Sequence, residues 1–143
     1  MTDLLTLYQI ADVEHIEVDC FELNKRESLS LMDEEGHRYI AVDPNKLCSV
    51  LDEKMKIAHE LGHCITNSFY NQRATFDIRQ KHENRADKWA IRQLIPKSAF
   101  FCALDNGYTE ICQLAEYFNV TEEFMCKAYC YYMHGNLAVE AYF

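Results

Sequence analysis

The first third of the chain alternates apolar and polar residues in a way that predicts short strands. Apolar and acidic residues alternate over 16–20, which is the period-two pattern of a half-buried strand. A second apolar run, 28–32, leads through a turn that contains Gly36 into a third run, 38–42, and this arrangement predicts a hairpin. A short helix is predicted over 4–11. We therefore expect a small antiparallel sheet in this part of the chain.

Beyond Pro44 the apolar residues recur with helical spacing. A long helix is predicted over about 47–67, because its apolar residues fall on one stripe when successive residues are turned by about 100°. That stripe contains Leu47, Leu51, Ala58, Leu61 and Ile65. The polar, aperiodic residues 70–80 predict a loop, and a second helix over 81–95 ends before Pro96.

The last third of the chain predicts two or three shorter helices. Segments 109–118 and 121–134 each open with a threonine that can cap a helix N-terminus. The whole pattern predicts an α+β fold in which a small antiparallel β-sheet packs against a helical bundle. With 143 residues, we expect one domain over 1–143, sheet-rich over about 1–44 and helical over about 45–143.

Composition and charge indicate which partners and which cellular compartment to expect. The chain carries 23 acidic against 14 basic residues, a net charge of −9, and sequence-independent nucleic-acid affinity depends largely on basic residues. We therefore expect no direct nucleic-acid partner. No apolar stretch reaches the roughly 18 to 20 residues of a membrane span, and the acidic N-terminal segment lacks the basic start of a signal peptide. The seven cysteines form no CxxC pair, as expected for free thiols in a reducing compartment. These features predict a cytoplasmic protein with no membrane partner.

The main chemical signal is the sequence His59-Glu60-Leu61-Gly62-His63, an HExxH motif inside the long predicted helix. Residues four apart share a helix face, so both imidazoles can bind one metal ion. The intervening Glu60 is then placed to act as the catalytic general base on water. The motif predicts a zinc site with His59 and His63 as ligands and Glu60 as catalytic residue.

The second predicted helix supplies a candidate for the third ligand that a catalytic zinc requires. Glu83 and Asp87 are four residues apart and share a face with the apolar residues Ala86, Ala90 and Ile91. A buried carboxylate is unfavourable unless it is paired or binds a metal. We therefore expect Glu83 to bind the metal. Asp87 is expected not to bind the metal itself. Instead it should orient a ligand histidine by binding the ring nitrogen that faces away from the metal.

These two segments together resemble a known family. MKIAHELGHCI followed by HENRADKWAIRQLIP resembles the ImmA/IrrE family of bacterial and phage metallopeptidases, over roughly 54–96. The spacing of Glu83 and Asp87 is also similar to that of thermolysin-like gluzincins. Arg85 stands where many members of the family have a second glutamate, and it points away from the predicted metal face.

The resemblance implies a zinc-dependent endopeptidase that hydrolyses a cytoplasmic protein. Family members typically cleave a repressor, so the implied partner is a helix-turn-helix repressor of a phage, mobile-element or stress regulon. The alternative is a zinc-bearing binding or sensor module that acts on a regulatory partner without hydrolysis. An intact Glu60 favours the enzyme, because a purely structural zinc site does not need a general base.

Other residues invite chemical interpretations, for which ordinary packing is the simpler explanation. Cys126, Cys130 and His134 recur every four residues, but two helical turns separate the outer pair. Tyr39 and Tyr70 are candidate hydrogen-bond donors among nine tyrosines, and His82 lies about 100° from the predicted ligand face. The segment 111–132 has a sequence pattern similar to that of helix-turn-helix segments. Lys127 is the one basic residue in its second helix, which favours a structural helix pair over a DNA-binding one.

Overall fold

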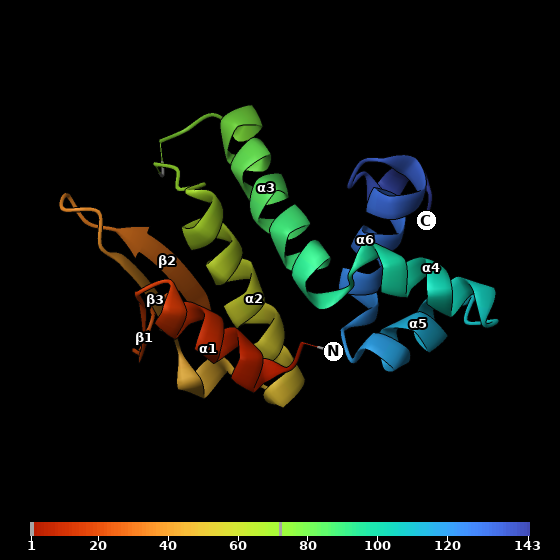
Figure 1. Cartoon of the computed structure of the whole chain (residues 1–143). Coiled ribbons are helices and arrows are strands. Elements are labelled where there is room, and N and C mark those ends of the chain that lie inside the picture. The colour runs from red at the N-terminus through yellow and green to blue at the C-terminus, as the bar shows by residue number, and fades with distance from the viewer. Residues whose placement is uncertain (1, 72) are drawn as a thin grey trace. The chain divides into compact units, whose positions relative to one another are not determined.

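The computed structural model describes residues 2–71 and 73–143. Over these residues the chain divides into two compact units, Thr2–Ala90 and Ile91–Phe143. The first unit begins with a helix, continues through three strands and a short 3-10 turn, and then forms a second helix (Figure 1). These elements are α1 (Leu4–Val13), β1 (Ile16–Cys20), β2 (Ser28–Met32), β3 (Arg38–Val42), η1 (Pro44–Lys46) and α2 (Val50–Thr66). Helix α3 (Phe76–Leu94) begins in the first unit and ends in the second.

The α+β fold class is confirmed, but the sheet is mixed rather than purely antiparallel. Its strand order is β1-β3-β2. The hairpin partners β2 and β3 are antiparallel, as expected, whereas β1 pairs with β3 in parallel. Strand β3 is therefore the central strand. The chain passes from β1 at one edge of the sheet to β2 at the other edge before it returns to β3 between them. Alternation within a strand predicts its two faces but not the direction of its neighbour, so the sequence pattern could not reveal this parallel pair.

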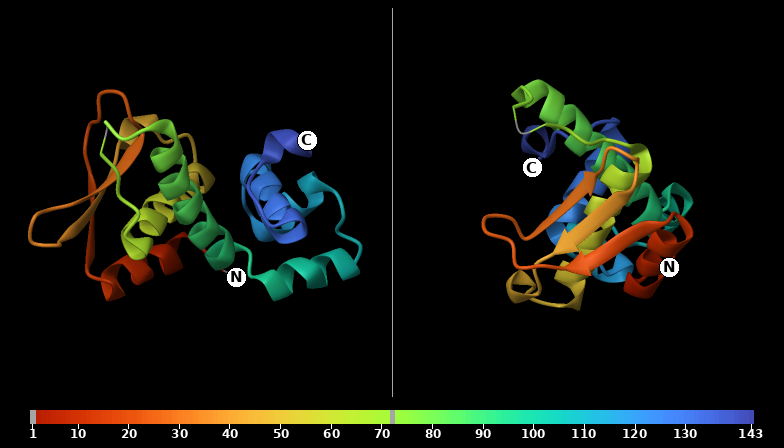
Figure 2. Two further views of the ribbon diagram at one scale, coloured as in Figure 1. Left: turned by 90° about the horizontal axis from the view of Figure 1, so that it is seen from above. Right: turned by 90° about the vertical axis from the view of Figure 1, so that its left-hand side faces the viewer.

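One face of the sheet packs on α2. Ile16, Ile40 and Val42 lie on this face and are almost completely buried. Helix α2 contacts both β2 and β3, and the right-hand view of Figure 2 looks at the sheet with α2 behind it. Strand β2 pairs with β3 on one side, and among the described residues its other edge is unpaired. The sheet therefore presents a free strand edge next to α2.

Helix α2 has clear end signals. Ser49 caps its N-terminus, where its side chain accepts a hydrogen bond from the amide of Asp52 at 3.1 Å. Asn67 ends the helix in the left-handed conformation with φ 57°. The helix buries Ile57, Ala58 and Leu61 against its neighbours. The sequence predicted this helix to within a few residues at each end.

Helix α3 begins at Phe76, so the loop predicted over 70–80 is too long. The first turns of the helix are largely exposed, with Phe76 70% and Ile78 49% accessible to solvent. These turns have no buried stripe, and hydrophobic periodicity cannot indicate a helix that buries nothing. The extra length does not alter the positions of Glu83 and Asp87 within the helix.

The second unit is helical. It contains α4 (Lys97–Asp105), α5 (Ile111–Phe118), α6 (Glu122–His134) and the short η2 (Val139–Ala141). Thr121 caps α6 as predicted, by accepting from the amide of Phe124 at 3.2 Å. The predicted cap at Thr109 is wrong: Glu110 is the N-cap of α5, and Gln113 accepts from its amide at 3.2 Å. The single domain over 1–143 stays a prediction. Across the described ranges, the helices are too short or too polar to traverse a bilayer.

Candidate metal centre

The two histidines of the HExxH motif lie side by side on α2. Their Nε2 atoms are 3.2 Å apart, with the ring planes nearly perpendicular. His63 is 5% exposed, and the side chain of His59 is 31% exposed. The helix brings them together because four residues are just over one turn. Two nitrogen atoms of the kind that metals bind therefore face the same small volume.

Helix α3 brings the carboxylate of Glu83 to these nitrogens. Glu83 Oε2 lies 2.9 Å from His59 Nε2, and Glu83 Oε1 lies 3.3 Å from His63 Nε2. A tetrahedral ion with bonds of about 2.0–2.1 Å keeps its ligand atoms about 3.3–3.4 Å apart. The separations between the three side chains are thus close to those that a single metal ion requires.

The other ring nitrogens determine which atoms are free to bind a metal. His63 Nδ1 lies 2.7 Å from the backbone carbonyl of Ser68, which can only accept, so Nδ1 carries the proton. His59 Nδ1 lies 3.0 Å from Asp87 Oδ1, which is also an acceptor when ionised. In the neutral rings both lone pairs are then on Nε2, where they face each other and Glu83. Such a cluster is unfavourable unless a cation or proton lies within it, so the donor set fits a metal.

The site perturbs the pKa values of its own groups. Burial lowers the pKa of His59, but hydrogen bonds to Asp87 and Glu83 outweigh burial and raise this pKa to about 10. For Glu83, burial raises the pKa, whereas hydrogen bonds from His59, His63 and Tyr70 bring it well below its ordinary value. Glu83 is therefore ionised at neutral pH. A proton and a metal ion therefore compete for His59.

Glu60 lies beside the same cluster. One donor atom from each of His59, Glu60 and His63 lies within 4.8 Å of the other two. Glu60 is 5% exposed, and its oxygens accept hydrogen bonds from the hydroxyls of Ser28 and Ser30 on β2, at 2.8 and 3.0 Å. The oxygens of Glu83 point at the two imidazole Nε2 atoms and lie 2.9 and 3.3 Å from them, closer than the oxygens of Glu60. The two glutamates therefore have different environments, which suits one for binding a metal and the other for accepting a proton.

These side chains open into a cleft of about 630 Å³. Strand β2 forms one wall, with Ser28, Ser30, Leu31 and Met32, and α2 forms another. Phe69 and Tyr70, which follow α2, line the cleft near His63 and Glu83. The cleft is open to solvent, lies along the free edge of β2, and contains His59, Glu60, His63 and Glu83 among its lining residues.

Four residues that the sequence pattern does not assign to the site support this cluster, and for one of them, Tyr70, the preference for ordinary packing is wrong. Tyr70 donates to Glu83 Oε1 at 2.6 Å, and its ring stacks on His82 at a centroid distance of 6.2 Å. Ser68 supplies the carbonyl that fixes His63, because Asn67 turns the chain back at the end of α2. Ser28 and Ser30 bind Glu60. No local sequence signal marks any of these contacts, since each depends on the packing of separate segments.

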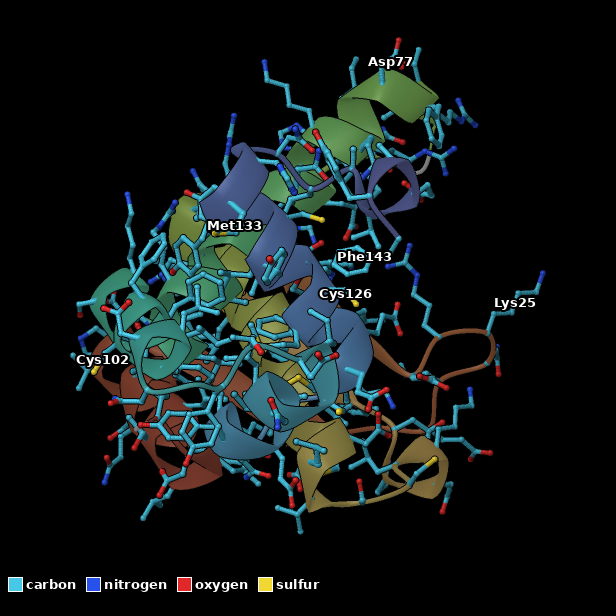
Figure 3. The ribbon with its side chains drawn as sticks, turned by 90° about the vertical axis from the view of Figure 1, so that its right-hand side faces the viewer. Lys25, Asp77, Cys102, Cys126, Met133 and Phe143 are labelled. Carbon is cyan, nitrogen blue, oxygen red and sulfur yellow. The ribbon has the colours of Figure 1, made fainter. Side chains whose placement is uncertain are left out.

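The remaining candidates are not part of the cluster. Tyr39 donates to Asp33 at 3.2 Å and is not among the residues that line the cleft. Cys126 lies on α6 (Figure 3), Cys130 is buried, and the ring of His134 stacks on Tyr142 at 3.8 Å. Among the described residues, no metal-binding group includes these three side chains of α6.

Gly62 allows α3 to approach α2 closely. A Cβ atom at Gly62 would lie 2.4 Å from the backbone oxygen of Ala86, one turn from Glu83. Helix propensity alone would favour Gly62→Ala by about 1 kcal/mol. We expect the clash to reverse this sign and destabilise the protein by about 1–3 kcal/mol, while Glu83 shifts and metal affinity falls. Urea unfolding and metal titration measure the two effects.

Gly36→Ala is the matched control for Gly62→Ala. Gly36 has φ +89°, and a Cβ atom added there would meet nothing within 4 Å, so alanine should be strained by about 1–2 kcal/mol without touching the cluster. Both variants should unfold more easily, but Gly62→Ala alone should bind metal more weakly. Normal metal affinity in Gly62→Ala would show that this close approach does not position Glu83.

A small mixed sheet, an HExxH helix and a second helix that presents a carboxylate to both histidines define the metallopeptidase class of protein. The comparison with known families agrees: the sequence profile of peptidase M78, described as the IrrE N-terminal-like domain, matches residues 15–129. The chain belongs to this family. A search of curated proteins gave no match.

Proposed function

We propose that the protein is a zinc-dependent endopeptidase. The observation that carries this proposal is the convergence of His59, His63 and Glu83 beside Glu60, inside a cleft that follows a free strand edge. Two imidazoles and one carboxylate form the ligand set of many catalytic zinc sites, in which a fourth position is left for water or substrate. Membership of a metallopeptidase family supports the same chemistry.

In this proposal the ligands are His59, His63 and Glu83. Glu83 is preferred to Glu60 as the third ligand because its oxygens lie 2.9 and 3.3 Å from the two Nε2 atoms. Asp87 keeps the His59 proton on Nδ1 and so leaves Nε2 free for the metal. The Ser68 carbonyl does the same for His63.

Glu60 is proposed as the general base. When bound, zinc supplies a Lewis acid that acidifies water and polarises a scissile carbonyl. The Glu60 carboxylate accepts a proton from the attacking water and then returns it to the leaving amine. Because Glu60 is almost buried and lies next to both histidines, it can serve a water molecule at the metal without itself being a ligand.

The edge of β2 supports an extended peptide as the substrate. An unpaired strand edge can bind an extended segment through backbone hydrogen bonds, largely independently of its side chains. This requires a flexible, exposed segment of the substrate protein. By analogy with the family, we propose that the substrate is a cytoplasmic helix-turn-helix repressor of a phage, mobile-element or stress regulon, and that the protein acts in the cytoplasm without binding nucleic acid itself.

Co-expression with a candidate repressor tests this function. A helix-turn-helix protein encoded by a neighbouring gene is the candidate of choice, and intact-mass measurement reports its cleavage. We expect two complementary fragments, and none when a membrane-permeant zinc chelator is added. A repressor that is inactivated but remains intact would contradict hydrolysis and favour the non-hydrolytic zinc-bearing module.

Replacing Asp87 by Asn should weaken zinc binding without preventing folding. Asparagine keeps the size of the side chain but removes the charge that fixes the His59 tautomer, and losing such a partner typically lowers metal affinity or activity by about 10- to 100-fold. Chelator competition measures the affinity. Asp52→Asn, which changes a carboxylate paired with Lys56 on α2, is the control and should bind zinc normally. Equal zinc affinity in the two variants would refute the role of Asp87.

A further inference from the structure

Two serines of β2 donate hydrogen bonds to the carboxylate of Glu60. Ser28 Oγ donates to Glu60 Oε2 at 2.8 Å, and Ser30 Oγ donates to Glu60 Oε1 at 3.0 Å. Each oxygen of the carboxylate therefore has its own donor. Glu60 is 5% exposed, so water competes weakly for these hydrogen bonds.

Two of the three inward-facing positions of β2 are serines, and the third is Met32. Ser28 pairs with Val42 and Ser30 with Ile40, and both partners are buried on the face that packs against α2. Leu31 points to the other face and is 45% exposed. A strand that served packing alone would have its apolar residues facing inward. The hydroxyls on the inner face are explained by their bonds to Glu60.

We propose that Ser28 and Ser30 are positioning residues that hold Glu60 as an oriented, charged base. This inference rests on the proposed function, because Glu60 accepts a proton only if the protein hydrolyses a bond. Hydrogen bonds to a charged group are stronger than those between neutral groups, and two donors fixed on one strand restrict the carboxylate to one orientation. Each oxygen keeps a second lone pair, which can accept a proton from water.

Orientation matters because proton transfer requires hydrogen-bond reach, about 2.6–3.2 Å between heavy atoms. Without its donors, the carboxylate would be free to rotate about its side-chain bonds and to approach the imidazoles, where it would compete with Glu83. The serines therefore act on the rate of the chemical step and not on substrate binding, so their loss should appear in kcat rather than in KM.

Urea unfolding of the zinc-loaded protein tests the coupling without any substrate. The double variant Ser28→Ala/Ser30→Ala leaves a buried carboxylate without donors, and we expect the folded-to-unfolded ratio to fall by about 10-fold or more. The same pair of changes in a Glu60→Ala background should alter this ratio by less than about 3-fold. Equal effects in the two backgrounds would show that the serines do not act through Glu60 and would overturn the proposal.

Cleavage kinetics then separate positioning from stability. The probe is the purified candidate repressor that the wild type cuts on co-expression. For Ser28→Ala/Ser30→Ala we expect kcat to fall by about 10- to 100-fold with KM changed less than about 3-fold, and zinc content to stay normal. Ser28→Thr and Ser30→Thr keep the hydroxyls and should retain most of the rate. Tyr39→Phe, which removes a hydroxyl that donates to Asp33, is the control and should leave kcat unchanged.

The outcomes distinguish this inference from the proposed function. If the wild type yields no fragments, the proposed function is wrong. If Glu60→Gln cleaves its target as fast as the wild type, Glu60 is not the general base and the serines have no base to position. If Glu60→Gln is inactive but the double alanine variant keeps the wild-type kcat, the function stands and the role of the serines is wrong. A kcat that falls equally in the alanine and threonine variants would also overturn it, because the hydroxyls would then be irrelevant.

Discussion

Replacing Glu60 by Gln should lower cleavage by about 100- to 10,000-fold while zinc content and fold are preserved. Glutamine has the shape of glutamate and can still bind the two serine hydroxyls, but it cannot accept a proton from water. Intact-mass measurement of the co-expressed repressor reports the cleavage, and elemental analysis of the purified variant reports zinc. Because the variant keeps the cleft and the metal, it should also trap the substrate that the wild type cuts.

Glu53→Gln is the matched control for this prediction. Glu53 lies on the same helix and accepts a hydrogen bond from Tyr8 rather than from a residue of the cleft. Its replacement should leave cleavage at the wild-type rate. If Glu60→Gln retained wild-type cleavage, Glu60 would not be the base. If both variants lost cleavage equally, the effect would belong to α2 as a whole and not to the proton acceptor.

Replacing Glu83 by Ala should lower zinc affinity by more than about 100-fold. Loss of a residue that only supports a metal ligand lowers affinity by about 10- to 100-fold, and the loss of a ligand should exceed this. The change removes the carboxylate that lies nearest both Nε2 atoms and leaves two imidazoles as protein ligands. It also removes the acceptor for the hydroxyl of Tyr70. Chelator competition and elemental analysis measure the loss. The effect should exceed that of Asp87→Asn, which acts through His59.

Glu53→Ala controls for the loss of a glutamate that accepts a tyrosine hydrogen bond, since Tyr8 donates to Glu53 as Tyr70 donates to Glu83. This variant should bind zinc normally. Wild-type zinc affinity in Glu83→Ala would mean that the third ligand is another residue, and Glu60 would then be the first candidate because it lies within the same donor cluster.

The sequence predicted the elements that carry the cluster because their signals are local. His59 and His63 are four residues apart on a helix with a clear apolar stripe, and helical geometry alone then places them on one face. Glu83 and Asp87 stood out as acids among apolar neighbours on the same face of a helix. The α+β class followed from the change of hydrophobic period after Pro44.

The contacts that the sequence could not predict are those between separate segments. The inward direction of Ser28 and Ser30 depends on which face of β2 packs on α2, and an alternating pattern with leucines on the outer face suggests the opposite. Tyr70 and the Ser68 carbonyl reach the cluster from the chain that follows α2, where no period constrains the backbone. The parallel pairing of β1 with β3 depends on the crossover of the chain, which no single strand encodes.

Hydrolysis in heavy-oxygen water tests the central claim most directly. Purified zinc-loaded protein is mixed with the candidate repressor in water labelled with a heavy oxygen isotope, and the fragments are analysed by mass spectrometry. A peptidase that uses water as nucleophile must place labelled oxygen in the new carboxyl terminus of the N-terminal fragment. We expect that label with the wild type and no fragment with Glu60→Gln over the same time. A repressor that loses its activity while its mass stays intact and unlabelled would contradict the account.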